Sequence, residues 1–347
     1  MKLSEIQIKP LLETLQLVDI TDEEYFGPKY RGYISNSRLT LINPEQDGSP
    51  EMYFEGLGKH SKYSDSLVFG SAVHCLVLQP NSFILIESVD RPTAKAGFMA
   101  DELYPIFCEN SVVTMDEVIA ASDKIDYYKG KMDADKTDAL RIKCENYYAQ
   151  RIAYEWGSNF IEDKNPIYLD TKSRDKLKLC LESVEQNEEI QKLLHPAYII
   201  NEPISLNEQT VLLDVELVFP DGKTLILKLK AKLDNFTIEK DNDIVTLNDL
   251  KTTGHYLTQF EESWERYHYY RQMGMYGWLL MLVAKQIYNI ENPVMKSNML
   301  LISTVPQFKA GVFEVTKNEM LRGFEEFKRL LRMVGIYTQV NLENVAG

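Results

Sequence analysis

The segment 225–253 holds the residues whose types and spacing could support chemistry at a metal ion. Asp249 and Lys251 stand two positions apart in VTLNDLKTT, and Asp234 ends the preceding run LILKLKAKLD. Side chains two apart on a strand share a face, and strands joined by a short turn lie side by side. We therefore expect both carboxylates and the amine to meet at one point. Paired carboxylates can hold Mg²⁺, and an amine can stabilise charge that develops on a phosphate.

A row of lysines leads along the same predicted strand toward Asp234. Lys228, Lys230 and Lys232 alternate with apolar residues over 225–233. This alternation predicts one apolar face on the core and one face that carries the lysines. We interpret the lysines as contacts for a phosphate backbone that end at a metal ligand. The alternative is an ordinary amphipathic strand with a solvated lysine face.

The surrounding pattern predicts the elements that must position these residues. From 199 to 251 the period is that of strands, with a hairpin signal at Pro220-Asp221-Gly222 and a polar turn at 239–243. The order of elements predicts an α/β (α+β) fold with a central mixed sheet flanked by helices and with helical N-terminal additions. Other expected elements are helices at 66–80, 170–194, 258–289 and 317–335, strands within 297–316, helical spacing over 95–165 and a loop at 45–65. Residues 31–44 are expected to form a loop that caps a helix, with Ser35 or Ser37 as N-cap and Pro44 at its end.

The D-(x)n-D-x-K arrangement on neighbouring strands resembles the signature of the PD-(D/E)XK nuclease superfamily. Within it, KAKLD followed by DLKTT is similar to the exodeoxyribonuclease VIII (RecE-type) family of phage recombination exonucleases. Three further segments are similar to motifs of that family, in family order: YISNSRLTLI, GSAVHCLVLQPNSF and YHYYRQMGMY. Together these segments span about 33–276. The resemblance implies a restriction-endonuclease-like core. We expect an N-terminal extension at 1–30 and one exonuclease domain at 31–347, with a helical insertion at 95–165 and the catalytic hairpin at 211–253.

By position, the resemblance also assigns roles to individual residues. Asp234 and Asp249 match the metal-binding acids, and Lys251 matches the catalytic lysine. The carbonyl of Leu250 is implied as an extra ligand. His74 matches a histidine near the metals, although a satisfied histidine in an apolar helix is the alternative.

Two helix residues and one further acid complete the candidate site. Gln272 and Tyr276 match the helix that follows the catalytic strands. They stand four apart, so they share a helix face and can reach a phosphate or support the catalytic lysine; ordinary packing is the alternative. Glu202 stands where the family often carries a glutamate, Glu216 is a second candidate, and a surface acid is the alternative for Glu202.

The activity that the resemblance implies is Mg²⁺-dependent digestion of linear double-stranded DNA. It implies two Mg²⁺ ions, with Mn²⁺ as a substitute, digestion from 5′ to 3′, and 3′ single strands as products. It also implies a single-strand annealing protein as partner and a homo-oligomeric ring, trimeric or tetrameric, around DNA. We assign DNA contacts to Ser35, Ser37, Lys228, Lys230 and Lys232.

Composition and charge narrow the classes of protein. Hydrophobic residues make up 44% and charged residues 26%, which is typical of a globular chain. The net charge of −14 counts against a protein that simply coats DNA, but a ring with a basic channel would reconcile it with DNA binding. No apolar run is long enough for a bilayer, and the start lacks the features of a signal peptide. We therefore expect a soluble, cytoplasmic protein, and the resemblance implies a phage or prophage origin.

Two alternative functions predict different sequence features. A Cas4-like or helicase-linked nuclease would usually carry a cysteine-ligated iron–sulfur cluster, whereas the four cysteines here are scattered and contain no CxxC pair. A catalytically silent DNA-binding scaffold would not need both acids and the lysine. Tyr127, Tyr128, Tyr147 and Tyr148 could stack on bases, but we favour packing. The sequence contains no P-loop, GxSxG or HExxH motif.

Overall fold

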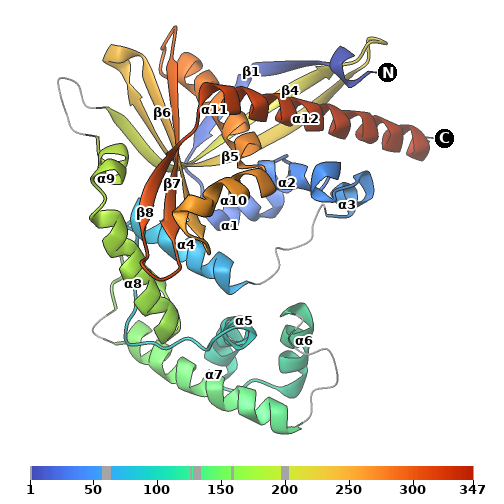
Figure 1. The fold of residues 1–347 in the computed structure, drawn as a ribbon. Coiled ribbons are helices and arrows are strands. Elements are labelled where there is room, and N and C mark those ends of the chain that lie inside the picture. Colours follow the sequence, from blue (N-terminus) through green and yellow to red (C-terminus); the bar gives the residue numbers. More distant parts are fainter. Residues whose placement is uncertain are drawn as a thin grey trace. The chain divides into compact units, whose positions relative to one another are not determined.

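The chain forms two compact units (Figure 1). The computed structural model describes residues 2–56, 64–125, 127, 134–157, 160–196 and 203–346. The first unit combines Met1–Lys59 with Val184–Gly347, and the second unit is His60–Ser183. The catalytic strands expected from the sequence belong to the first unit.

A six-stranded mixed sheet forms the centre of the first unit. Its order is β1-β4-β5-β6-β7-β8, in which β6 and β7 are parallel and all other neighbours are antiparallel. Helices flank the sheet, so the expected mixed α/β fold class is confirmed (Figure 1). The strands are β1 (Gln7–Val18), β4 (Ile204–Val218), β5 (Thr224–Glu239), β6 (Ile244–Thr253), β7 (Val294–Ser303) and β8 (Ala310–Glu314).

Two turns connect the three strands that carry the predicted site. Between β4 and β5, Gly222 adopts φ +84°, a conformation that only glycine reaches without strain, and the Phe219 amide bonds to the Lys223 carbonyl. Between β5 and β6, a 3₁₀ turn at Lys240–Asn242 leads to Asp243 in the left-handed region. Both turns stand where the sequence predicted them, so the expected hairpin is confirmed.

The N-terminal segment contributes a strand to the sheet. Residues Gln7–Val18 form β1, which pairs with β4 and occupies an edge. Pro10 is compatible with that place because an edge strand need not donate every amide. The sequence predicted only a short amphipathic pattern here, since the apolar residues of IKPLLETLQLV fit no strict alternation.

Several short helices surround the sheet, and two expectations about them were wrong. The segment 45–65 was expected to be a loop, but it contains α3 (Pro50–Glu55), which Ser49 caps. The single helix expected at 258–289 is broken at His268, whose φ of +52° starts a new helix axis. The helices of this unit are α1 (Asp22–Phe26), α2 (Asn36–Thr40), α3, α9 (Glu188–Leu194), α10 (Phe260–Arg266), α11 (Tyr269–Gln286) and α12 (Lys317–Ala346), with 3₁₀ turns at Leu3–Glu5, Pro28–Tyr30, Pro44–Gln46 and Leu257–Gln259.

Helix α11 is held against α12 by a close crossing at two glycines. A Cβ atom at Gly323 would collide with the carbonyl of Tyr270, and one at Gly274 would collide with the backbone of Phe324. No other residue fits at either position without separating the helices. α11 also contacts β1, β4, β5, β6 and β7, so it is fixed on the sheet as well as on α12.

The second unit is mainly helical and has its own core. The helical structure that the sequence predicted over 95–165 is confirmed for most of that region. Tyr147 and Tyr148 are 1% and 3% exposed, so the packing interpretation holds for them, while Tyr128 lies outside the described residues. Its elements are α4 (Asp65–Leu78), β2 (Phe83–Leu85), α5 (Lys95–Asn110), α6 (Met115–Ile125), α7 (Ala134–Glu155), β3 (Asn165–Ile167) and α8 (Thr171–Glu185), which continues two residues into the first unit.

None of the helices in the described part of the chain combines the length and apolar character that a bilayer crossing needs.

Candidate active site

The two predicted metal-binding acids stand where β5 and β6 part. Backbone pairing between these strands runs as far as Asn235 and Asn248, and Asp234 and Asp249 come directly after that last pair. The Leu250 amide donates a hydrogen bond of 2.7 Å to Asp234 Oδ2. Asp234 is therefore bonded to the backbone of the residue that follows Asp249. Both carboxylates are buried, Asp234 at 9% exposed and Asp249 at 0%.

Lys251 joins the acids as the sequence predicted. Its Nζ lies 2.6 Å from Asp249 Oδ2, and the Lys251 side chain keeps 21% of its surface exposed. Burial on its own would lower the pKa of Lys251, but the negative charges of Asp249 and Asp234 outweigh it and raise the pKa. The same amine donates a longer bond of 3.4 Å to the Leu250 carbonyl. The two acids and one amine therefore converge on one point.

Helix α11 supplies a further contact to this point. Gln272 Nε2 donates a hydrogen bond of 2.6 Å to Asp249 Oδ1, so Gln272 supports the acid and not Lys251. Tyr276, one turn later, is buried among the same acids. Burial, together with the nearby Tyr25, Asp249 and Asp234, raises the pKa of Tyr276 well above its usual value.

Replacing Gln272 by alanine is expected to lower turnover about tenfold, because residues that orient metal-binding carboxylates contribute about that much. Asp249 would lose the bond that fixes its Oδ1, while Lys251 would keep its own. The matched control is Gln286→Ala, an exposed glutamine at the end of the same helix. Equal rates for both variants would contradict this role.

A third acid, Glu208 on β4, was not predicted from the sequence. Asn207 pairs with Asn235 and Gln209 with Leu233, so Glu208 lies across from Asp234. Their carboxylates offer oxygens within 4.8 Å of each other. Glu208 has a φ of +54°, a strained backbone for a non-glycine residue, which is typical of functional positions.

Of the two further acids proposed from the sequence, only Glu216 lies among the described residues. Glu202 lies outside the described residues. Glu216 is on β4 but eight residues beyond Glu208, which is about 26 Å along a strand. Its cross-strand partners are Lys9 and Ile226, away from the acids.

The three lysines of β5 differ in their surroundings. Lys228 is exposed, as a solvent-facing lysine should be. Lys230 is buried and donates a 2.5 Å bond to the Tyr25 carbonyl. Burial and the nearby charge of Arg38 lower the pKa of Lys230 to about 8. Lys232 pairs with Asp22 at 2.5 Å and with Glu208 at 3.2 Å.

Helix α1 therefore covers much of the lysine face of β5. Asp22 forms an ion pair with Lys232, and the backbone carbonyl of Tyr25 accepts a hydrogen bond from Lys230. DNA binding by these lysines stays a prediction, and Lys228 is the one of the three that is exposed.

Ser35 and Ser37, which were predicted to contact DNA, stand at the start of α2. Ser35 is the N-cap of α2, where its hydroxyl accepts a 3.3 Å bond from the Arg38 amide, and Ser37 Oγ lies 3.0 Å from Ser35 Oγ. Their contacts with DNA stay predictions. His74 is a partly buried residue of α4 in the second unit, and its role as a metal ligand also stays a prediction.

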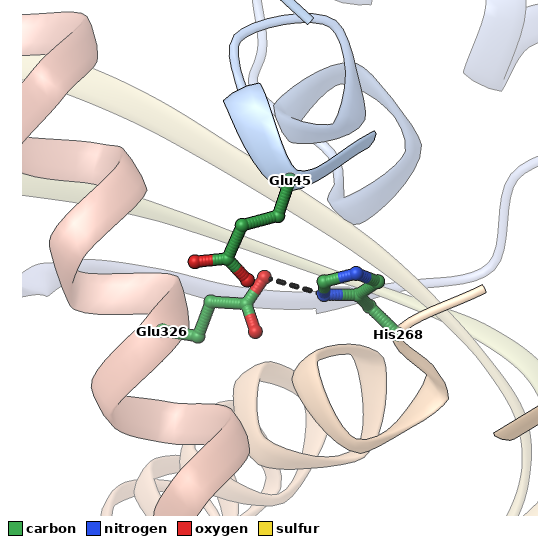
Figure 2. Close-up of side chains that lie close together, drawn as sticks. All are labelled: Glu45, His268 and Glu326. Atoms are coloured by element: carbon green, nitrogen blue, oxygen red, sulfur yellow. Dashed lines mark hydrogen bonds and ion pairs between the residues drawn. The ribbon is translucent and has the colours of Figure 1, made fainter. Parts of the chain in front are cut away.

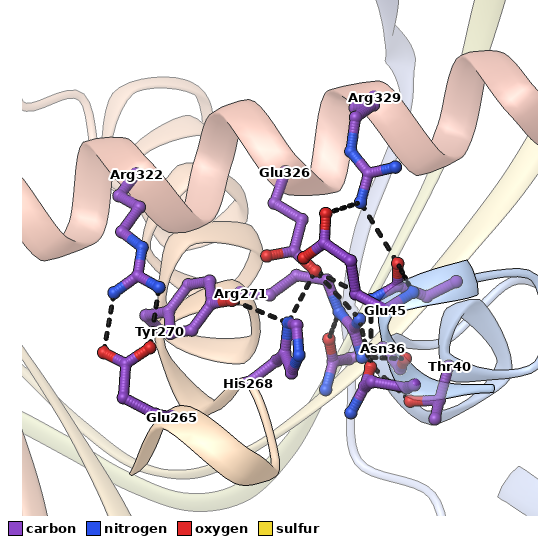
Figure 3. A network of polar contacts seen from close by, with 12 residues as sticks. Asn36, Thr40, Glu45, Glu265, His268, Tyr270, Arg271, Arg322, Glu326 and Arg329 are labelled. Atoms are coloured by element: carbon purple, nitrogen blue, oxygen red, sulfur yellow. Dashed lines mark hydrogen bonds and ion pairs between the residues drawn. The ribbon is translucent and has the colours of Figure 1, made fainter. Parts of the chain in front are cut away.

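A buried arginine next to Gln272 fixes the first turn of α11 (Figure 3). Arg271 is 0% exposed and donates hydrogen bonds to Asn36, Gln46 and Thr40 at 2.8, 2.7 and 2.8 Å. It also pairs with Glu326 of α12 at 3.3 Å. Because Arg271 directly precedes Gln272, these bonds hold the residue that orients Asp249.

Glu45, His268 and Glu326 gather beside this arginine (Figure 2). His268 Nδ1 lies 2.9 Å from Glu326 Oε1, and the three side chains offer ligand atoms within 4.8 Å of one another. The guanidinium groups of Arg271 and Arg329 already bind Glu326 and Glu45, each at 3.3 Å. We therefore interpret this cluster as an anchor for α11 and not as a metal site.

Replacing Arg271 by methionine is expected to destabilise the protein by about 3–5 kcal/mol, because it leaves the Glu326 carboxylate buried without its cation. The matched control is Arg322→Met. Arg322 pairs with Glu265 at 2.7 Å, but both side chains are about half exposed, at 49% and 55%, so its loss should cost about 0–1 kcal/mol. Denaturant unfolding of both variants measures the difference, and equal losses would contradict the assignment.

The chain matches no protein-family model, and no curated protein matches its sequence. It is similar to a solved crystal structure described as "Putative exonuclease" from Eubacterium rectale, with a TM-score of 0.45 and 13% identity over 92% of this chain and 88% of that chain. At this degree of likeness, activity has to be inferred from the site.

Proposed function

We propose that this protein is a Mg²⁺-dependent exodeoxyribonuclease with a PD-(D/E)XK active site. The observation that carries the proposal is the convergence of Asp234, Asp249 and Lys251 where β5 and β6 part. This is the D…D-x-K geometry that the sequence motif requires. Gln272 adds to it by fixing one oxygen of Asp249.

The residues at this point fit a hard divalent cation. Asp234, Asp249, Glu208 and the Leu250 carbonyl offer only oxygen atoms, which Mg²⁺ and Mn²⁺ prefer to nitrogen or sulfur. When bound, two such ions would activate a water molecule and neutralise the scissile phosphate. No cysteine takes part in any group of potential metal ligands in the part of the chain that the structure describes, which disfavours an iron–sulfur nuclease.

The chain's own groups would do the remaining work. Lys251 would donate hydrogen bonds to the phosphate as negative charge develops there, because its ammonium group is already oriented by Asp249. Gln272 would keep the two oxygens of Asp249 in distinct roles, since one faces the amide and the other faces the amine.

The substrate in this proposal is linear double-stranded DNA, digested from 5′ to 3′ to leave 3′ single strands. We include in it a single-strand annealing protein as partner and a trimeric or tetrameric ring. A ring fits the net charge of −14, because only the channel would need to be basic.

Duplexes labelled at either 5′ or 3′ ends test the proposal. With Mg²⁺, the expected result is early release of the 5′ label, retention of the 3′ label, and no cleavage of a closed circle. Release without Mg²⁺, or cleavage of the circle, would overturn the exonuclease proposal. A protein that binds duplex ends with Mg²⁺ and releases nothing would instead be the silent scaffold.

Replacing Lys228 by alanine is expected to weaken binding of duplex DNA and to reduce the slope of log affinity against log salt by about 1. Lys228 is exposed, so it can release a counterion when it meets a phosphate. The matched control is Lys285→Ala, an exposed lysine at the far end of α11. If the slope is the same for both variants, Lys228 is not a DNA contact.

A further inference from the structure

A continuous row of asparagine side chains crosses four strands of the sheet. Asn298 Nδ2 donates to Asn248 Oδ1 at 2.9 Å, and Asn248 Nδ2 donates to Asn235 Oδ1 at 2.7 Å. Asn235 Nδ2 then donates to Asn207 Oδ1, also at 2.7 Å. All the bonds run in one direction, from β7 through β6 and β5 to β4. We call these four residues the asparagine ladder.

Three of the four ladder residues are buried, and the central amides are well satisfied. Asn235 and Asn248 are 0% exposed, and Asn298 is 8% exposed. Asn248 Nδ2 makes a second bond, of 3.4 Å, to the Leu193 carbonyl of α9. Asn235 Nδ2 likewise reaches Ser205 Oγ at 3.4 Å. Such a network is stable only if every member keeps its partner, because a buried amide that loses its hydrogen-bond partner is not compensated by water.

Each candidate metal-binding acid is the chain neighbour of one ladder residue. Glu208 follows Asn207, Asp234 precedes Asn235, and Asp249 follows Asn248. Neighbouring side chains on a strand point to opposite faces, so the ladder and the acids lie back to back. The contacts agree, since Asn248 meets α9 while Asp249 meets α11.

The ladder also marks the place where two strands separate. Asn235 and Asn248 are the last residues of β5 and β6 that pair, and the acids begin one residue later. Backbone hydrogen bonds to the other strand hold the register only up to this point. The side-chain hydrogen bond between Asn235 and Asn248 is therefore the last link between β5 and β6 before the acids.

We propose that the asparagine ladder is a register lock that positions Glu208, Asp234 and Asp249 in one row for divalent cations. A slip of one residue would move an acid to the wrong face. The same slip would place each buried amide opposite a leucine, phenylalanine or carboxylate and break the ladder. The asparagines are thus positioning residues, and their purpose rests on the proposed function.

Exchange of the Leu250 amide hydrogen tests the lock without any activity measurement. This amide is bonded to Asp234 Oδ2, so its protection reports whether the acid keeps its place. Asn235→Leu and Asn248→Leu are expected to lower protection of Leu250 at least about tenfold relative to the amides of Leu213 and Leu229 in the same sheet.

Asn298→Leu is the matched control, because it removes an outer link whose chain neighbour is Met299 and not an acid. It should leave Leu250 protected to within about threefold. The double variant Asn235→Leu/Asn248→Leu covers the case in which a single variant does not fold. It removes both partners of the central bond, so it should be more stable than the sum of the single losses predicts.

Calorimetric titration with Mn²⁺ in the absence of DNA gives a second readout. The two central variants are expected to bind Mn²⁺ at least about tenfold more weakly than Asn298→Leu does. Equal losses of Leu250 protection and Mn²⁺ affinity in all three single variants, including equal failure to fold, would overturn the lock. Digestion of end-labelled duplex by the wild type tests the proposed function separately, so failure of one idea is distinguishable from failure of the other.

Discussion

Replacing Lys251 by alanine is expected to lower Mg²⁺-dependent release of nucleotides from linear duplex by at least about a thousandfold. The variant removes the one ammonium group that Asp249 holds beside the candidate metal site. DNA binding should change little, because a single amine is a small part of the contact with the phosphate backbone. Measuring turnover and affinity separately therefore distinguishes loss of chemistry from loss of substrate.

The sign of the Lys251 pKa shift predicts a cost in stability as well. The pKa of Lys251 is higher in the folded state than its value of 10.5 in the unfolded chain. The ammonium group therefore stabilises the fold fully at pH values below 10.5, and this stabilisation is lost as the pH rises through the pKa of the folded state. At pH 7 to 8 the alanine variant should thus be less stable, by about 3 kcal/mol. Lys251→Gln keeps most of the side-chain length and a hydrogen-bond donor but lacks the charge. Lys296→Ala, which replaces an exposed lysine on β7, is the control.

Replacing Asp249 by asparagine should have an effect of similar size for a different reason. Asparagine keeps the shape but removes a negative charge that both Lys251 and a divalent cation would meet. Turnover should fall by about a thousandfold or more, because the ion would lose a charged ligand. The wild type should gain stability when Mn²⁺ is added, by about 2.7 kcal/mol at a hundred times its dissociation constant, and the variant should gain none.

Asp243→Asn is the matched control for that measurement. It makes the same substitution just before the same strand, at an exposed position whose left-handed backbone asparagine tolerates well. It should keep both turnover and the stabilisation by Mn²⁺. A clear Mn²⁺ shift that survives in Asp249→Asn would show that the cation binds elsewhere in the protein.

The sequence predicted the central part of the site because that part is local. Asp249 and Lys251 share a face by strand alternation alone, and a short turn brings Asp234 beside them. Gln272 follows on the next long helix, and the motif placed it near the acids. What it bonds to could not be predicted, because the direction of an amide depends on packing around α11.

Glu208 was missed because its position depends on a long-range register. It stands 26 residues before Asp234, across a hairpin of two long strands. An error of one residue in either strand would put it on the wrong face, and no local pattern fixes that count. The asparagines that do fix it in the structure look, in sequence, like ordinary polar residues.

The lysine face shows a different limit of sequence reasoning. Alternation correctly predicted that the lysines of β5 would share a face, with Leu229, Ala231 and Leu233 buried on the other. It could not predict that Asp22 and Tyr25, some 200 residues earlier in the chain, would cover that face. Beyond Asp234 the apolar residues move to the even positions, at Phe236 and Ile238, which a single alternation rule also misses.

The place of β1 at the edge of the sheet has a practical consequence for anyone who shortens this protein. β4 lies between β1 and β5, and the Thr14 hydroxyl accepts a hydrogen bond of 2.8 Å from the Asp214 amide. Deleting the first 20 residues would turn β4 into a long, unprotected border rich in valine and leucine. Exposed edge strands pair with strands of other molecules, so the shortened chain should aggregate on expression.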